Sequence, residues 1–155
     1  MSDALLVTPY YEPNVVGGAE ISVQLIAEGL PDRCDVLTFG EKDGLRTCGG
    51  VDIYEINFPV FTNLWAKYLD GRDLTVKNRL DAHLRTLFPT NRNVNRYLKF
   101  FKERKYETII MNSNEGVMDR PSLWKAAHDS GARVILTLRD NLLLERRFAA
   151  LIAEE

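Results

Sequence analysis

Short apolar runs alternate with longer amphipathic segments along most of the chain. Five of the runs predict strands, at residues 4–8, 35–39, 51–56, 108–111 and 134–137. The first is apolar and ends at Pro9, which is typical of a strand buried on both faces of a sheet. The run 51–56 alternates apolar and polar residues with a period of two, as expected near a sheet edge.

The amphipathic segments predict helices. Residues 19–30 carry apolar positions at Ile21, Leu25, Ile26 and Gly29, and Pro31 closes the segment. Leu80, Leu84, Leu87 and Phe88 mark a second helix, and Val94, Tyr97, Leu98 and Phe101 mark a third. Further helices are predicted over 121–130, where Gly131 follows the end, and over 145–155, whereas 58–70 is interpreted as irregular or as a short helix.

Strands that alternate with helices of about a dozen residues imply βαβ crossovers. The fold class is therefore α/β, and we expect a Rossmann-like three-layer sandwich with a mostly parallel sheet. The 155 residues fit a single domain, 1–155. Ligands of such sheets bind at the carboxyl ends of the strands, which directs attention to loops 9–18, 112–120 and 138–144.

Composition excludes several classes of protein. Hydrophobic residues make up 45% and charged residues 27% of the chain, which is typical of a soluble domain and excludes disorder. Aliphatic stretches are much shorter than the roughly 20 residues that span a bilayer, and no basic export signal opens the chain. Cys34 and Cys48 match no zinc or redox spacing, so we expect two free thiols, no metal and a cytoplasmic location.

The charges are unevenly distributed. Lys and Arg outnumber acids ten to three within residues 72–105, although the net charge of the whole chain is −2. Such a block is typical of a protein with an anionic partner, such as a membrane surface or a phosphorylated substrate. Solvated outer faces of two helices explain it equally well. Nucleic acid is not expected, because no recognised binding module accompanies the charge.

Gly17 and Gly18 stand at the predicted start of the first helix. Unpaired N–H groups and the positive end of the helix dipole meet there, so a phosphate or diphosphate is a natural ligand. A tight turn is an equally good explanation of two adjacent glycines. The patterns GxGxxG, GxxxxGK[ST], HExxH and GxSxG are absent, which argues against nicotinamide binding, P-loop hydrolysis, zinc-protease chemistry and serine-hydrolase chemistry.

Two separated motifs together resemble a known family. Residues 7–20, VTPYYEPNVVGGAE, are similar to the opening of the N-terminal domain of family 4 type glycosyltransferases, which have the GT-B fold. Residues 123–127 (LWKAA), Gly131 and residues 134–144 (VILTLRDNLLL) resemble that family's helix, strand and Thr-Leu-(His or Arg)-Asp loop. The motifs occur in the family's order, on the expected elements.

The resemblance implies one half of a GT-B architecture. The family transfers a sugar from a nucleotide-diphosphate sugar to an acceptor, with retention of configuration and without a required metal or other cofactor. This chain would be the acceptor-side N-terminal domain, and the C-terminal nucleotide-sugar-binding domain would be absent, so the isolated chain should be inactive. The alternative is a stand-alone, non-catalytic Rossmann-like domain for ligand binding or protein interaction.

The resemblance also assigns roles to particular residues. Gly17 and Gly18 would face the donor diphosphate, and Arg139 and Asp140 are the predicted catalytic pair. Many family members carry His at position 139, whereas Arg is a permanent cation suited to orienting substrate or binding an anion. A salt bridge that only shapes the loop is the alternative for this pair. The remaining predicted substrate-binding residues are Tyr11, Asn14, Glu20, Asn112 and Asn114.

The expected partners are a nucleotide sugar, a glycan or lipid-linked acceptor and the missing C-terminal domain. If the acceptor is lipid-linked, the basic block 72–105 would bring the domain into peripheral contact with the inner face of an anionic membrane.

Overall fold

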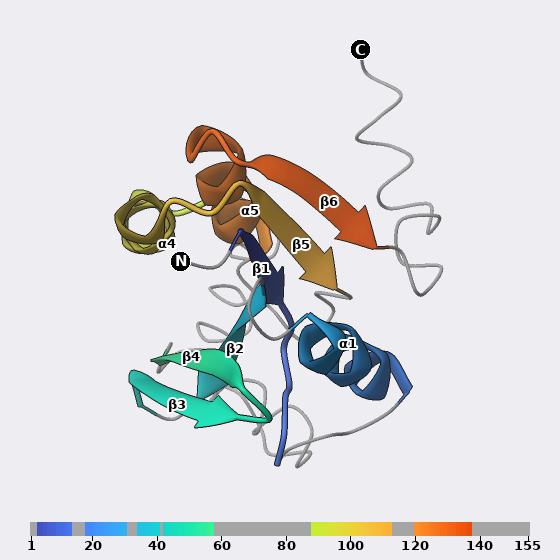
Figure 1. The fold of residues 1–155 in the computed structure, drawn as a ribbon. Coiled ribbons are helices and arrows are strands. Elements are labelled where there is room, and N and C mark those ends of the chain that lie inside the picture. Colours follow the sequence, from blue (N-terminus) through green and yellow to red (C-terminus); the bar gives the residue numbers. More distant parts are fainter. Residues whose placement is uncertain are drawn as a thin grey trace, which may run out of the picture.

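The computed structural model describes residues 3–13, 18–30, 34–40, 42–57, 88–112 and 120–137. Its elements are β1 (Ala4–Val7), α1 (Gly18–Gly29), β2 (Cys34–Gly40), β3 (Gly44–Cys48), β4 (Val51–Asn57), α4 (Asn91–Arg104), β5 (Thr108–Asn112), α5 (Arg120–Asp129) and β6 (Arg133–Thr137). The strands form one sheet in the order β3-β4-β2-β1-β5-β6 (Figure 1). All neighbouring pairs are parallel except β3 and β4. The predicted α/β class and the mostly parallel, Rossmann-like sheet are confirmed.

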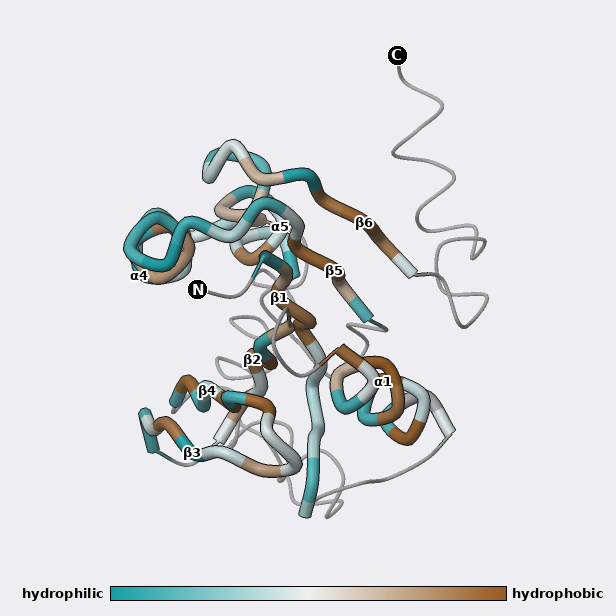
Figure 2. Tube along the Cα trace, viewed as in Figure 1, coloured by the Kyte–Doolittle hydropathy of each residue, from teal (hydrophilic) through white to brown (hydrophobic). Residues whose placement is uncertain are grey.

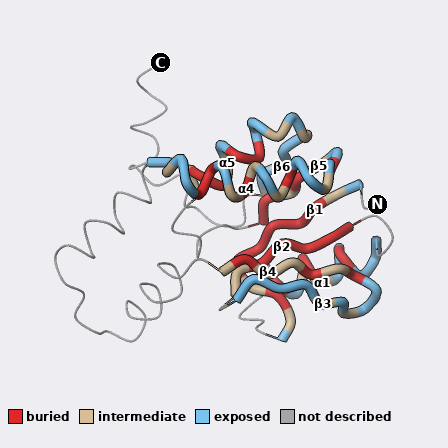
Figure 3. The backbone as a smooth tube through the Cα atoms, turned by 90° about the vertical axis from the view of Figure 1, so that its left-hand side faces the viewer, coloured by how far each residue is buried: buried red, intermediate tan, exposed pale blue. Residues whose placement is uncertain are grey.

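Two apolar cores lie on opposite faces of the sheet. Along β1, Leu5 and Val7 belong to one core and Leu6 to the other, because successive side chains of a strand alternate. Helices α4 and α5 contribute to the core of Leu5 and Val7, and α1 contributes to the core of Leu6. Figure 3 shows the buried strands between these two helical layers. The sandwich therefore has the three layers that the sequence predicts.

Strand β3 is an element that the sequence analysis missed. It pairs antiparallel with β4 across Gly49 and Gly50, whose φ angles of 59° and 80° lie in the left-handed region. Two consecutive residues of positive φ suit the tight type I′ hairpin, and glycine adopts them without a steric penalty. The strand itself is mostly exposed, so it carries no run of apolar residues that would predict it.

The three predicted helices that fall within the described residues were correct in position and only partly correct in the face that is buried. For α4, Val94, Tyr97 and Phe101 are buried as expected. For α1, however, Val23 and Ala27 form the buried side. The large apolar residues of the predicted face are exposed instead: Ile21 by 51%, Leu25 by 67% and Ile26 by 42%. The smaller side chains of the helix are the ones that pack against the sheet.

Figure 2 shows the hydropathy along the chain, with most of β6 and the first part of β5 hydrophobic and the outer side of α4 hydrophilic. Both cysteines are free thiols, as expected, with Cys34 buried and Cys48 half-buried. In the part of the chain that the structure describes, no helix is both long and apolar enough to cross a membrane. Three predicted segments lie outside the described residues: the segment 58–70, the helix marked by Leu80, Leu84 and Leu87, and the helix over 145–155. Of the helix that begins near Leu80, only Phe88 is described.

Candidate functional site

The strand order reverses between β1 and β5. Strands β2 and β4 lie on one side of β1, whereas β5 and β6 lie on the other. Loops that leave the carboxyl ends of two such strands diverge to opposite faces and leave a crevice, which is where open α/β sheets bind ligands. The residues that follow β1, β5 and β6 are therefore the candidates, and they coincide with the three loops chosen from the sequence.

Asn112 ends β5 at this position. Its side chain is buried with 1% of its surface exposed, and it pairs in register with Thr137 at the end of β6. The Thr137 hydroxyl lies 2.9 Å from the carbonyl oxygen of Met111 and 3.2 Å from Oδ1 of Asn112, so it shares one proton between two acceptors. Nδ2 of Asn112 has no hydrogen-bond partner among the described residues. A buried amide in this state costs stability, and such groups call for an explanation such as a ligand.

Helix α1 begins at Gly18, after the loop that leaves β1. A Cβ added at Gly18 would meet no atom within 4 Å, so the first turn is open to an approaching ligand. The N–H groups of a first turn have no partners within the helix and bind anions well. The predicted diphosphate contact at Gly18 stays a prediction, and so does the alternative of a tight turn, because Gly17 lies outside the described residues.

Glu20 and Tyr11, both predicted to bind substrate, are largely buried. Glu20 lies in the first turn of α1, where a carboxylate interacts favourably with the helix dipole, and only 9% of it is exposed. Tyr11 packs in the apolar core between α1 and the sheet, in the same cluster as Val23 and Ala27. Burial, followed by the nearby carboxylate of Glu28, raises the pKa of Tyr11 to about 12, so its phenol keeps its proton.

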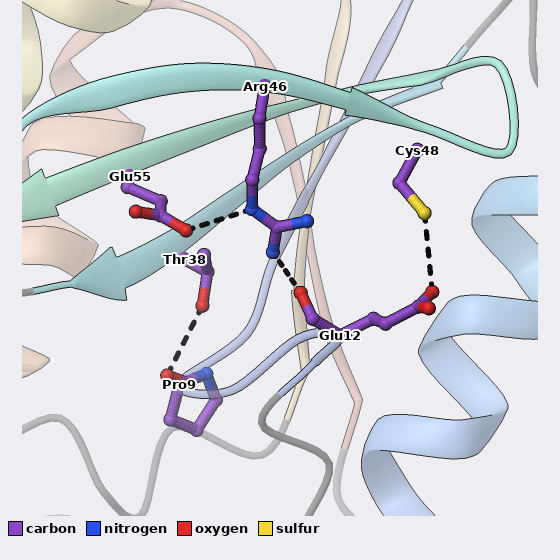
Figure 4. A network of polar contacts seen from close by, with 6 residues as sticks. All are labelled: Pro9, Glu12, Thr38, Arg46, Cys48 and Glu55. Atoms are coloured by element: carbon purple, nitrogen blue, oxygen red, sulfur yellow. Dashed lines mark hydrogen bonds and ion pairs between the residues drawn. The ribbon is translucent and has the colours of Figure 1, made fainter.

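A network of polar contacts fixes the loop between β1 and α1 (Figure 4). Arg46 Nη2 on β3 donates to the carbonyl oxygen of Glu12, and Arg46 Nε is paired with Glu55 Oε1 at 2.9 Å. The Thr38 hydroxyl on β2 donates to the carbonyl oxygen of Pro9 at 3.3 Å. Three strands therefore hold the loop that leads to Gly18.

The carboxylate of Glu12 adds two further contacts. It accepts a hydrogen bond from Gln24 of α1 at 3.0 Å and lies 3.4 Å from the thiol of Cys48. The hydrogen bond to Glu12 raises the pKa of the Cys48 thiol. Arg46 and Glu55 were not predicted from the sequence to anchor the loop. The Gly49-Gly50 pair before an alternating segment was the available signal, since it predicts a hairpin that brings the two strands together.

The other predicted site residues lie outside the described residues: Asn14, Gly17, Asn114, Arg139 and Asp140. Strand β6 ends at Thr137, two positions before Arg139, and it ends in register with Asn112. Among the described residues, no group of His, Cys, Asp and Glu is arranged to hold a metal ion.

Comparison with known proteins gives one distant similarity to report. An uncharacterized 42.6 kDa protein in the cps region of Klebsiella pneumoniae is 28% identical over 153 residues, covering 90% of this chain and 37% of that protein. The chain thus spans little more than a third of the length of this relative. No family model matches the chain.

Proposed function

We propose that this chain is the acceptor-side, N-terminal domain of a retaining glycosyltransferase of GT-B architecture. The complete protein would move a sugar from a nucleotide-diphosphate sugar to a glycan or lipid-linked acceptor. A C-terminal domain would bind the nucleotide sugar, so the chain alone would have little or no activity. No metal or other cofactor is required in this proposal.

The observation that carries the proposal is the open start of α1 in the loop that follows β1. The N–H groups in the first turn of a helix have no partners within the helix, so an oxyanion that reaches Gly18 could accept from them. Asn112 offers a buried amide at the end of the neighbouring strand β5. Negative charge develops on the diphosphate as the nucleotide departs, and fixed donors lower the barrier most when they face developing charge.

The similarity to a protein from a cps region supports the same proposal. Genes of such regions direct capsule polysaccharide synthesis, in which sugars are joined one after another. A transferase is therefore an expected member of the region. Arg139 and Asp140 would follow β6 into the same crevice, with Arg139 orienting substrate or holding an anion.

The test uses the full-length protein that contains this chain. It is incubated with UDP-, GDP- and ADP-sugars and a saccharide acceptor extract, and the release of nucleoside diphosphate is measured with and without EDTA. We expect release that depends on the acceptor and that EDTA leaves unchanged. A product with inverted anomeric configuration, or no release that depends on the acceptor, would contradict the proposal and favour the stand-alone binding domain.

A matched pair of variants tests whether the start of α1 contributes to sugar transfer. Gly18→Leu places a side chain where the diphosphate would approach and should lower kcat/KM by about tenfold or more, equivalent to about 1.4 kcal/mol of transition-state stabilisation. Gly29→Leu is the control, since a Cβ at this other end of the helix also meets nothing within 4 Å. Equal losses in both variants would show a general effect on the helix and would count against the site.

A further inference from the structure

A second cavity lies beside the crevice, at the carboxyl end of β2, and we propose that it binds a neutral saccharide ring. Its volume is about 360 Å³, within the range of ligand pockets. The lining residues are Tyr10, Tyr11, Thr38, Phe39, Gly40, Lys42 and Glu55. They come from the loop after β1, from the end of β2 and the residues after it, and from β4, and they include neither Gly18 nor Asn112.

The carboxylate of Glu55 is held in a defined position in this cavity. Its Oε1 is paired with Arg46 Nε at 2.9 Å. Its other oxygen, Oε2, accepts from no described donor and lies over Gly40, where an added Cβ would come within 3.0 Å of it. Glycine at position 40 therefore leaves room for the carboxylate, and Oε2 remains able to accept a hydrogen bond from a ligand hydroxyl.

The rest of the lining complements a polyhydroxylated ring. Thr38 uses its proton on the carbonyl oxygen of Pro9, so its oxygen can still accept a hydrogen bond. Lys42, which is exposed, supplies donors at the edge of the cavity. The half-buried ring of Tyr10 offers apolar surface, suited to the C–H face of a sugar.

The carboxylate also decides which kind of ligand the cavity favours. A phosphate beside Glu55 would place two negative charges in one small cavity, and such charges repel each other at short distance. A neutral saccharide meets no such repulsion and satisfies both donors and acceptors. Binding of the sugar needs no nucleotide donor, but its interpretation as part of the acceptor rests on the proposed function.

The test is a titration of the isotope-labelled 155-residue chain, followed by amide chemical shifts. The probes are the methyl glycosides of glucose, galactose, mannose and N-acetylglucosamine, with inorganic phosphate as the anionic comparison. We expect at least one glycoside to shift the amides of residues 10–11 and 38–42 with a Kd of about 1–10 mM, as befits a single ring. Phosphate shifts at those amides without glycoside shifts would overturn the proposal.

Two alanine variants provide the matched control. Gly40→Ala places a Cβ against Glu55 and should weaken glycoside binding about fivefold or more. Gly44→Ala, on the neighbouring strand β3, adds a Cβ that meets nothing within 4 Å and should leave binding unchanged. Unaltered binding in Gly40→Ala, with its chain folded, would overturn the assignment of the site.

Glu55→Gln serves if Gly40→Ala fails to fold. It removes the charge while keeping the shape of the side chain, and it should also weaken binding of the glycoside. Full binding in this variant would overturn the role of the carboxylate. Glycoside binding without sugar transfer by the full-length protein would refute the proposed function and leave this site standing, so the two failures are distinguishable.

Discussion

At the scale of single residues, Asn112 combines burial with an unsatisfied donor. Only 1% of it is exposed, and Nδ2 has no hydrogen-bond partner among the described residues. A buried polar group without a partner typically costs about 1–3 kcal/mol. Such a cost persists at positions where function needs the group, which is how we interpret Asn112.

Replacing Asn112 with leucine should separate stability from binding. The variant loses the contact between Oδ1 and Thr137 but also removes the unsatisfied amide, so the free energy of unfolding should change by less than about 1 kcal/mol. The affinity of the chain for inorganic pyrophosphate, measured by calorimetry, should fall. A loss of more than about 2 kcal/mol in urea unfolding, with pyrophosphate affinity unchanged, would assign Asn112 to the fold alone.

Cys34 should make stability depend on pH in the alkaline range. Burial, and then the charge of Asp35, raises the pKa of its thiol from 9.0 to about 11. Below pH 9 the thiol is protonated in both the folded and the unfolded chain, so its stabilising contribution is complete. Between pH 9 and 11 the unfolded chain loses the proton first, and this contribution is progressively lost as the pH rises through the pKa of the folded state.

The measurement is urea unfolding at several pH values for the parent chain and Cys34→Ala. The parent should lose up to about 1.4 kcal/mol more per pH unit in this window, because one proton is involved. All other titratable groups are common to both proteins and cancel in the comparison. Parallel stability curves would show that Cys34 ionises equally easily in the folded and unfolded states.

At the scale of elements, turn chemistry fixes where several helices and strands end. Gly131 was predicted to follow the end of α5, and it has a φ of 83° there. The preceding Ser130 N–H bonds back to the carbonyl of Ala126 at 3.0 Å, which closes the helix before β6 begins. A left-handed residue at this position is a common end of a helix, and glycine adopts it without strain.

Gly131→Ala should therefore lower stability through the backbone alone. A Cβ at this position meets nothing within 4 Å, so the expected loss of about 1 kcal/mol in the free energy of unfolding arises from the positive φ. Gly44→Ala, for which the space is equally open, should differ from the parent by a few tenths of a kcal/mol at most. Thermal and urea unfolding of the two variants give the comparison, and equal stabilities would refute the explanation by strain.

At the scale of the whole molecule, periodicity predicts most of the sheet and turn chemistry explains the exception. Five of the six described strands carry apolar runs, which in β1, β2, β4 and β5 follow from burial on one or both faces, whereas β6 at the sheet edge is mostly exposed. Strand β3 is polar and exposed because it covers the edge of the sheet, so its pairing depends on the turn at Gly49 and Gly50. The anchors Arg46 and Glu55 were missed for the same reason, since their role requires knowledge of that pairing.

The candidate site was predictable only in part, because the spacing of residues along the sequence does not give the distances between them in the fold. The position of Gly18 at the start of a helix follows from local signals, and the placement of Asn112 at a strand end follows from periodicity. The burial of Tyr11 in the core depends on how the loop folds back over β2 and β4, which no local pattern encodes. The buried face of α1 likewise depends on the sheet beneath it.

The basic block 72–105 leads to a prediction for the whole molecule, which is contact with an anionic membrane. Part of its charge is used within the molecule: Arg96 is paired with Asp43 at 2.5 Å, and Arg104 lies 4.2 Å from the ring centres of both Tyr54 and Phe100. On α4, Arg92 and Lys102 are exposed, three turns apart along the helix. These two cations can face a lipid surface without breaking either internal contact.

We therefore expect the double variant Arg92→Ala/Lys102→Ala to bind anionic vesicles about 30-fold more weakly, at about 1 kcal/mol for each cation near the surface. The double variant Lys125→Ala/Arg133→Ala removes the same charge from α5 and β6 and is the control. Co-sedimentation with phosphatidylserine vesicles at two salt concentrations measures the effect, because attraction between surface charges weakens as salt is added. If neutral vesicles retain the protein equally well, apolar contact governs the binding. If both double variants lose the same affinity, net charge governs it. In either case α4 has no specific role.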